Sequence, residues 1–241
     1  MLSLSTDNIQ KQAPDSISAF KDLVNFSTCD NRGVQLPDAC RAWTQLTVCS
    51  LYMTRLKAIP HWLGEWSLLE SLAIETETRL DFSPIAALHN LKNLSIQTYE
   101  KHQTDWANVQ LDLSKLTELS INICSKNQTH GLETFHAFIN ACNPNLENIF
   151  YADTTLVHIP NFWDKFPNIK TVELVGNFKS IARNTQTILA TYLIIYSQEL
   201  ESLDLNWDLF PNLESISGYD SVFKQPAIQK SIPKHIIIYS H

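Results

Sequence analysis

A six-residue motif, Leu-x-x-Leu-x-Leu, recurs along most of this chain and constrains its fold more than any other feature. Another apolar or small residue replaces Leu at several positions. The copies begin at Leu46, Leu69, Leu91, Leu116, Leu146, Ile169, Leu200, Leu213 and Pro233. Their starts are 13 to 31 residues apart, and most steps measure 20 to 25 residues. A repeat of this length predicts a chain of similar turns in which neighbouring turns share one core, because no single turn can bury its own apolar side.

Three pairs of an aliphatic residue and a proline are in phase with the motif. They are Leu36-Pro37, Ile59-Pro60 and Ile159-Pro160. Each proline lies nine residues before the next start of the motif. With the repeated motif, these pairs resemble the leucine-rich repeat family over nearly all of residues 34–238.

The resemblance implies an α/β fold, a leucine-rich repeat solenoid. Its concave face would be a curved parallel β-sheet with one strand per motif, and helices and irregular returns would form its convex face. In the family, the aliphatic-proline pair closes the loop after the strand. We expect residues 1–33 to be an N-terminal helical cap and residues 34–241 to hold about eight or nine turns, including a C-terminal cap.

Two long steps between motifs contain apolar residues at three- and four-residue spacing, which predicts helical returns at 133–141 and 185–198. The step from Leu200 to Leu213 is too short for a full turn. Either Leu200–Leu205 ends a helical return, or the solenoid is broken there. In the cap, Ile17, Phe20, Leu23 and Val24 fit one face of a helix. At the other end, 236–239 could form the last strand.

The charge balance bears on the class of partner. The 241 residues include 18 Lys and Arg against 25 Asp and Glu, a net charge of −7, which disfavours a nucleic-acid partner. In the family, positions 2, 3, 5, 7 and 8 of the motif point to the concave face. The acidic residues at these positions are Glu70, Glu75, Glu118, Glu147, Asp153, Glu173, Glu201, Asp204, Glu214 and Asp220, and the basic ones are Lys92, Lys170 and Lys234. The predicted face therefore carries the whole net charge.

The same positions hold large apolar side chains, which often anchor protein interfaces. They are Tyr52, Met53, Ile123, Phe150, Trp207, Tyr219 and Tyr239. We predict that a partner protein with a basic surface binds at Tyr52, Glu75, Glu118, Phe150, Asp153, Glu173, Asp204, Trp207, Glu214 and Tyr219. The alternative is a solvated acidic face that only keeps the protein soluble.

No catalytic signature accompanies the repeats, so we expect a binding protein and not an enzyme. The eight histidines form neither a His-Glu-x-x-His motif nor a His/Cys ligand set, and no metal or cofactor is predicted. The five cysteines lack a Cys-x-x-Cys pair, which favours reduced, mostly buried thiols.

The sequence shows neither an apolar run long enough to span a membrane nor a secretory signal, so we expect a cytoplasmic monomer. It also resembles repeat effectors that intracellular bacteria deliver into host cytosol by type IV secretion, without a classical signal peptide. The alternative is an intracellular adaptor, such as a substrate-recognition subunit of a ubiquitin ligase, or an enzyme regulator.

Overall fold

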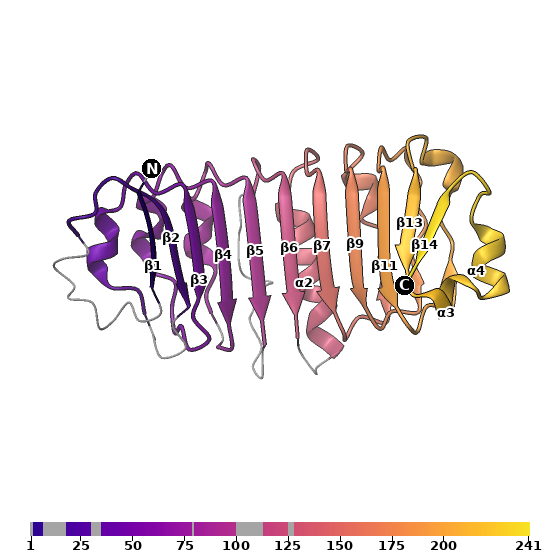
Figure 1. Ribbon diagram of the computed structural model, residues 1–241, viewed down its shortest axis with the longest axis horizontal. Coiled ribbons are helices and arrows are strands. Elements are labelled where there is room, and N and C mark those ends of the chain that lie inside the picture. The colour runs from indigo at the N-terminus through magenta and orange to yellow at the C-terminus, as the bar shows by residue number, and fades with distance from the viewer. Residues whose placement is uncertain (1, 7–17, 30–34, 79, 100–112, 125–127) are drawn as a thin grey trace. The chain divides into compact units, whose positions relative to one another are not determined.

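The structure is a computed structural model that describes residues 2–6, 18–29, 35–78, 80–99, 113–124 and 128–241. The chain divides into two compact units. The N-terminal unit comprises Met1–Leu116 with His136–Cys142, and the C-terminal unit comprises Thr117–Phe135 with Asn143–His241. Each unit contains a parallel β-sheet to which each repeat adds one strand (Figure 1).

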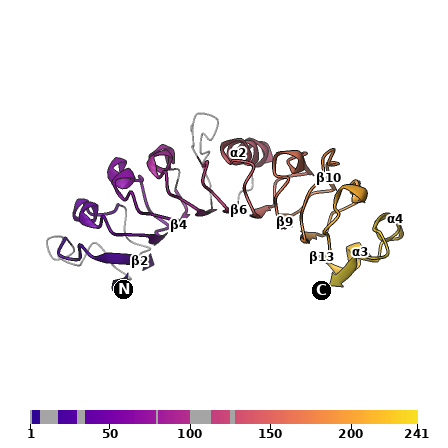
Figure 2. The same cartoon turned by 90° about the horizontal axis from the view of Figure 1, so that it is seen from above.

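The sheet of the N-terminal unit follows chain order. Its strands are β1 (Leu2–Thr6), β2 (Leu23–Cys29), β3 (Val48–Tyr52), β4 (Ser71–Thr76) and β5 (Asn93–Thr98), and each is parallel to the next. Short 3-10 helices lie in the returns: η1 (Asp38–Ala42), η2 (His61–Glu65) and η3 (Ser83–Ala87). Figure 2 shows these helical turns on one side of the sheet, which leaves its other side open.

The main sheet of the C-terminal unit contains β6 (Glu118–Ile123), β7 (Asn148–Asp153), β9 (Thr171–Gly176), β11 (Tyr192–Ser197), β13 (Ser215–Gly218) and β14 (Ile237–Ser240), all parallel. A second sheet in the returns pairs β8 (His158–Ile159), β10 (Ser180–Ile181) and β12 (Ser202–Leu203). The helical elements are η5 (Trp163–Lys165), η6 (Trp207–Leu209), α3 (Asp220–Phe223), α4 (Pro226–Ser231) and the first part of α2 (Gln128–Ala141), whose residues from His136 on belong to the N-terminal unit. The helix predicted at 133–141 is thus confirmed within α2.

Five returns reach their strands through two successive i to i+3 turns. In one repeat, the Trp66 amide donates to the Leu63 carbonyl (3.1 Å), and the Leu69 amide donates to the Trp66 carbonyl (2.9 Å). The same pair of bonds is centred on Trp43, Leu88, Phe166 and Phe210. The middle residue is large, apolar and at most 3% exposed in all five repeats. The motif position that follows is also buried, so the turn delivers both side chains to the core.

Side chains of neighbouring repeats stack within this core. In the N-terminal unit, the Trp43 and Trp66 rings stack with their centroids 6.3 Å apart, and Phe26 lies 4.7 Å from Trp43. The buried Trp66 indole donates its Nε1 proton to the Cys40 carbonyl, 3.1 Å away, so its polar group is satisfied by the preceding repeat. Aromatic packing therefore joins consecutive turns of this unit.

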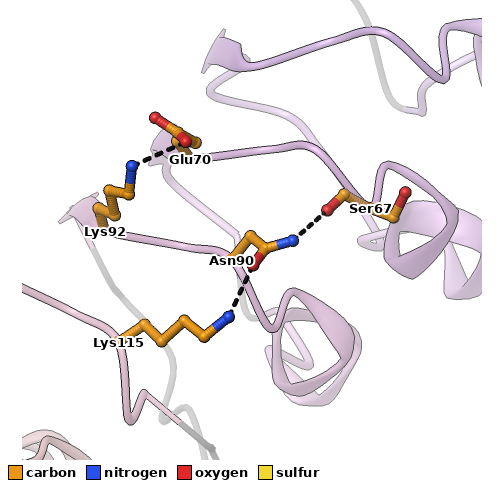
Figure 3. A network of polar contacts seen from close by, with 5 residues as sticks. All are labelled: Ser67, Glu70, Asn90, Lys92 and Lys115. Carbon is orange, nitrogen blue, oxygen red and sulfur yellow. Dashed lines mark hydrogen bonds and ion pairs between the residues drawn. The ribbon is translucent and has the colours of Figure 1, made fainter.

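Polar side chains also link successive repeats, at the loops that precede the strands (Figure 3). Asn90 donates from Nδ2 to the Ser67 carbonyl (2.7 Å) and accepts from Lys115 Nζ (2.8 Å). Nearby, the ammonium of Lys92 lies 2.8 Å from the Glu70 carboxylate of the previous repeat. These contacts span one repeat each and hold the loops in register.

The proline pairs lie where the resemblance places them. Pro37 and Pro60 directly precede η1 and η2, while Leu36, Ile59 and Ile159 are buried. A proline suits the residue before a helical turn because its missing N–H would have no intrahelical partner there.

The helix predicted over 185–198 is wrong, because residues 192–197 form strand β11. A missed copy of the motif, Ala190-x-x-Leu193-x-Ile195, starts 21 residues after Ile169 and 23 before Leu213. All three of its apolar residues are at most 2% exposed. The Leu200 copy supplies β12 in the second sheet and no strand of the main sheet. The 13-residue step therefore lies within one repeat, and the main sheet continues through it.

The last strand predicted over 236–239 is confirmed, one residue further along, as β14, whereas two other predictions for the ends of the chain are wrong. Leu23 and Val24 begin strand β2 and do not continue a helix, and Ile17 lies outside the described residues. The predicted C-terminal copy is out of register by two residues, because Ile238 and not Ile236 pairs with Ile216 of β13. Strand pairing with the neighbouring repeat overrides the local apolar pattern at both places. The division into a cap of 33 residues and a repeat domain stays a prediction.

Asp164 joins two repeats of the C-terminal unit. Its carboxylate accepts hydrogen bonds from the Thr185 amide (2.8 Å), the Thr185 hydroxyl (2.5 Å), the Gln186 amide (2.9 Å) and the Asn161 side chain (2.8 Å). Partial burial opposes ionisation, but the four donors outweigh it and lower the pKa of Asp164 below its ordinary value of 3.8.

We expect Asp164→Ala to lower the free energy of unfolding by about 1–3 kcal/mol, because it leaves backbone donors of the next repeat unpaired. Chemical denaturation at pH 7 measures this change. The contribution should disappear as the pH falls through the lowered pKa, since the carboxyl then loses its charge. Asp208→Ala, at an exposed position of η6, is the matched control and should change stability little. Equal losses from both variants would contradict the role of Asp164.

Candidate functional site

Alternate residues of the C-terminal sheet point away from the core, and the strand register aligns them in three rows. The first row is Glu118, Asn148, Thr171, Tyr192, Ser215 and Ile237. The second is Ser120, Phe150, Glu173, Ile194, Ser217 and Tyr239. The third is Asn122, Ala152, Val175 and Tyr196, and it continues past the strand ends to Tyr219 and His241. We call these residues the C-terminal outward face.

This face is rich in apolar and aromatic side chains that the fold leaves accessible. Tyr192, Ile237 and Tyr239 are 45%, 54% and 52% exposed, respectively. The rings of Tyr196 and Tyr219 meet edge to face with centroids 5.3 Å apart. Ser215 and Ser217 occupy the outward positions of β13, so small hydroxyl groups separate the larger side chains of β11 and β14.

The outward positions of the N-terminal sheet have a different composition. On β2 to β5 they are Asn25, Ser27, Cys29, Val48, Ser50, Tyr52, Ser71, Ala73, Glu75, Asn93, Ser95 and Gln97. Small hydroxyl and amide side chains predominate, and Tyr52 is the one aromatic residue in this set. The apolar surface suited to binding is therefore concentrated in the C-terminal unit.

Two carboxylates at this surface lie in contrasting environments. Glu214 is exposed directly before β13 and accepts a hydrogen bond from the Tyr192 hydroxyl at 3.2 Å. The charge of Glu214 and this bond raise the pKa of Tyr192 above its ordinary value of 10.0, so the phenol stays neutral. Glu173 is half-buried at the centre of β9, and burial raises the pKa of its carboxyl above the ordinary value of 4.5.

The structure groups five of the ten predicted binding residues. Glu118, Phe150, Glu173 and Tyr219 belong to the C-terminal outward face, and Glu214 borders it. The other predicted positions are separate from this surface. On the N-terminal sheet, Tyr52 is exposed and Glu75 is half-buried.

Three predicted binding residues are placed elsewhere by the fold. Asp153 is 2% exposed, and its carboxylate binds the Thr155 amide (2.7 Å), the Thr155 hydroxyl (2.6 Å) and the Tyr151 hydroxyl (3.1 Å). Asp204 and Trp207 follow β12 in the returns, because the Leu200 copy of the motif is not a strand of the main sheet. Met53 and Ile123 are also buried and unavailable for binding.

The prediction that the whole net charge lies on one face is wrong. Five of the ten acidic residues counted there form ion pairs: Glu70 with Lys92, Glu147 with Lys170, Glu201 with Lys179, Asp204 with Arg183 and Asp220 with Lys224. Asp153 is buried, as described above. Glu118, Glu173 and Glu214 are the acidic residues that remain at the C-terminal surface, and Glu75 lies on the other unit.

Sequence reasoning placed Val175 on the face, at position 7 of the Ile169 copy, but missed three other residues: Tyr192, Ile194 and Tyr196. These three were assigned to a helix because a short apolar run is ambiguous between helix and strand. Two signals favour the strand. Aromatic and β-branched residues dominate the run, and the motif starting at Ala190 restores an even spacing of repeats.

The described residues show no metal-binding or membrane-spanning feature. They contain no group of three or more His, Cys, Asp or Glu arranged to hold a metal ion. None of the helices in the described part of the chain is long and apolar enough to cross a bilayer. Cys40, Cys49 and Cys142 are buried, and Cys29 and Cys124 are exposed. Burial raises the pKa of the Cys40 thiol to about 12, so this thiol stays protonated at neutral pH.

Comparison with known proteins connects this geometry to a recognised fold. No protein-family model and no curated protein matches the chain. Among solved structures, the leucine-rich repeat domain of the type III effector XopL is similar, with a TM-score of 0.55 and 16% identity over 99% of this chain and 76% of that one. A leucine-rich repeat protein of Leptospira interrogans has a TM-score of 0.57 and 14% identity over 100% of this chain and 72% of that one. The chain therefore has the leucine-rich repeat fold.

We expect Glu173→Gln to stabilise the protein at pH 7. A carboxyl whose pKa is raised by folding binds its proton more tightly in the folded state, so stability falls as the pH rises through that pKa. Glutamine removes this dependence. Thermal unfolding should show a melting temperature about 1 °C or more above that of the wild type at pH 7 and no difference near pH 4.

Glu118→Gln is the matched control, because Glu118 is an exposed outward glutamate of β6. It should leave the melting temperature unchanged at both pH values. A Glu173→Gln variant that is less stable than the wild type at pH 7 would contradict our account of Glu173.

Proposed function

We propose that this protein is an interaction module that binds another protein through the C-terminal outward face. The observation that carries this proposal is the concentration of accessible aromatic and aliphatic side chains on one ordered sheet. They are Phe150, Val175, Tyr192, Ile194, Tyr196, Tyr219, Ile237 and Tyr239. Exposed apolar patches rimmed by polar groups are typical of protein-binding surfaces.

The scaffold favours binding because the face is ordered before a partner arrives. Each strand in the main sheet of the C-terminal unit is hydrogen-bonded to its neighbours in a continuous register. Tyrosines such as Tyr196 and Tyr219 supply large contact areas with few rotatable bonds, and they already pack together. Little conformational entropy is then lost on docking, which leaves more of the contact energy for affinity.

The charges of the face favour a partner with a basic surface. Its outward positions include two glutamates, Glu118 and Glu173. At the residue directly before a strand, Glu214 borders the face, as do Glu147 and the Lys170 paired with it. Among the outward residues on β6 to β14, none is Lys or Arg. Such an arrangement accelerates the encounter with a cationic protein and disfavours nucleic acid, whose phosphates it repels.

Site-specific photo-crosslinking tests which surface meets a partner. A benzophenone amino acid placed at Ile194 should give a discrete crosslinked adduct in lysate of the source cell or in eukaryotic cytosolic lysate. The same probe at Asp208, which is exposed on the return η6, is the control. Adducts of equal yield from both sites, or from Asp208 alone, would contradict binding through the sheet.

A second experiment measures the contribution of the aromatic side chains. Once a crosslinked protein is purified, Tyr196→Ala should weaken its binding by about tenfold or more, because aromatic residues at interfaces often act as hot spots. Ser95→Ala, on an outward position of the N-terminal sheet, should change the affinity little. Calorimetric titration of both variants against that protein gives the comparison.

The effector hypothesis is separate from the binding hypothesis. Similarity to a domain of a type III effector extends to the fold alone, so delivery into host cytosol stays a prediction for this chain. A translocation assay with a reporter fusion tests it. An adaptor or regulator that works inside its own cell would use the same face without being exported.

A further inference from the structure

One carboxylate of the C-terminal outward face has unusual surroundings. Glu173 is the central outward residue of β9, and the register places Phe150 of β7 and Ile194 of β11 directly beside it. Along its own strand, the adjacent outward residues are Thr171 and Val175. Three of its four nearest outward neighbours are therefore apolar, and its carboxylate is partly withdrawn from water.

Nothing in the described structure neutralises this charge. No side chain among the described residues donates a hydrogen bond to the Glu173 carboxylate or forms an ion pair with it. On the flanking strands β7 and β11, no outward residue is Lys, Arg, His, Asp or Glu.

Other glutamates show that the repeat can supply a cation where one is needed. Glu70 is paired with Lys92 at 2.8 Å, and Glu147 is paired with Lys170 at 2.7 Å. In both pairs the lysine comes from the equivalent position of the next repeat. At the position that would serve Glu173 in the same way, β11 carries Ile194. The chain therefore has an apolar residue, Ile194, at the position where a lysine could have paired with Glu173.

We propose that Glu173 binds a single lysine or arginine side chain of the partner protein, whose aliphatic stem lies against Phe150 and Ile194. Long cationic side chains suit this site because their stems cover apolar surface while their head groups reach a carboxylate. Pairing within the interface would offset the cost of the partly desolvated charge, which the free protein bears without a partner. This inference rests on the proposed function and specifies its chemistry.

A phage-displayed library of random 12-residue peptides tests the proposal and does not require the partner to be identified first. The baits are the wild type, Glu173→Gln and the control Glu77→Gln, which is exposed after β4 in the N-terminal unit, each first shown to be folded by thermal unfolding. Peptides selected on the wild type should be enriched in Lys or Arg next to Leu, Ile, Phe or Tyr. A synthetic peptide from this set should bind Glu173→Gln about tenfold or more weakly, and Glu77→Gln almost as well as the wild type.

A double-mutant cycle shows whether the peptide cation contacts Glu173 itself. Replacing the enriched Lys or Arg by norleucine should weaken binding to the wild type, and the same replacement should have little effect on binding to Glu173→Gln. Additive losses from the two changes would overturn the proposed pair.

Two face variants, Ile194→Ser and Tyr196→Ala, separate failure of this inference from failure of the proposed function. Peptides that lose affinity for these variants but bind Glu173→Gln unchanged would overturn the role of Glu173 and leave the binding face intact. Peptides unaffected by all three changes would overturn both proposals. A selection that enriches no sequence above an unrelated bait would also contradict both.

Discussion

The structure depends on one constraint, which is that a single turn of this chain cannot bury its own apolar side. Each repeat directs the first, fourth and sixth residues of its motif inward, and most of these residues are at most a few per cent exposed. They are covered only because the next repeat presents the same residues one strand further along. The double turn centred on residues such as Trp66 and Phe166 makes this stacking possible, since it places a large side chain in the core directly before each strand.

Polar contacts between repeats follow from the same periodicity. A side chain in a loop lies near the equivalent position of the next repeat. Two residues of suitable chemistry at such positions therefore come into contact. Asn90 and the pair of Glu70 with Lys92 use this geometry at the loops, while Asp164 uses it to fix backbone amides of the following return. Such bridges explain why several acidic residues of the predicted face lie beside a cation of the next repeat.

The outward residues of the sheets do not take part in this packing. The composition of these positions can therefore differ between the two units. One sheet presents mainly small hydroxyl and amide groups, whereas the other presents aromatic rings around Glu173. A half-buried carboxylate without a partner does not contribute to folding. Its presence among apolar neighbours is more readily understood as a requirement of recognition than of stability.

The repeated motif and the spacing of apolar residues are enough to predict the periodic core, the parallel strands at regular motifs, the places of the phased prolines and the α2 helix. In these segments the local apolar pattern fixes which residues are buried. The three- and four-residue spacing of the apolar run around Tyr192 fits a helix, although its aromatic and β-branched residues favour a strand, and the local pattern gave the wrong register for β14. Only pairing with neighbouring repeats decided these. The membership of the C-terminal outward face was decided in the same way. Tyr196 lies on this face because β11 belongs to the main sheet, whereas Asp204 lies in the returns with β12. A residue's side of the sheet depends on which strand its repeat supplies, and strand pairing is a property of the tertiary structure.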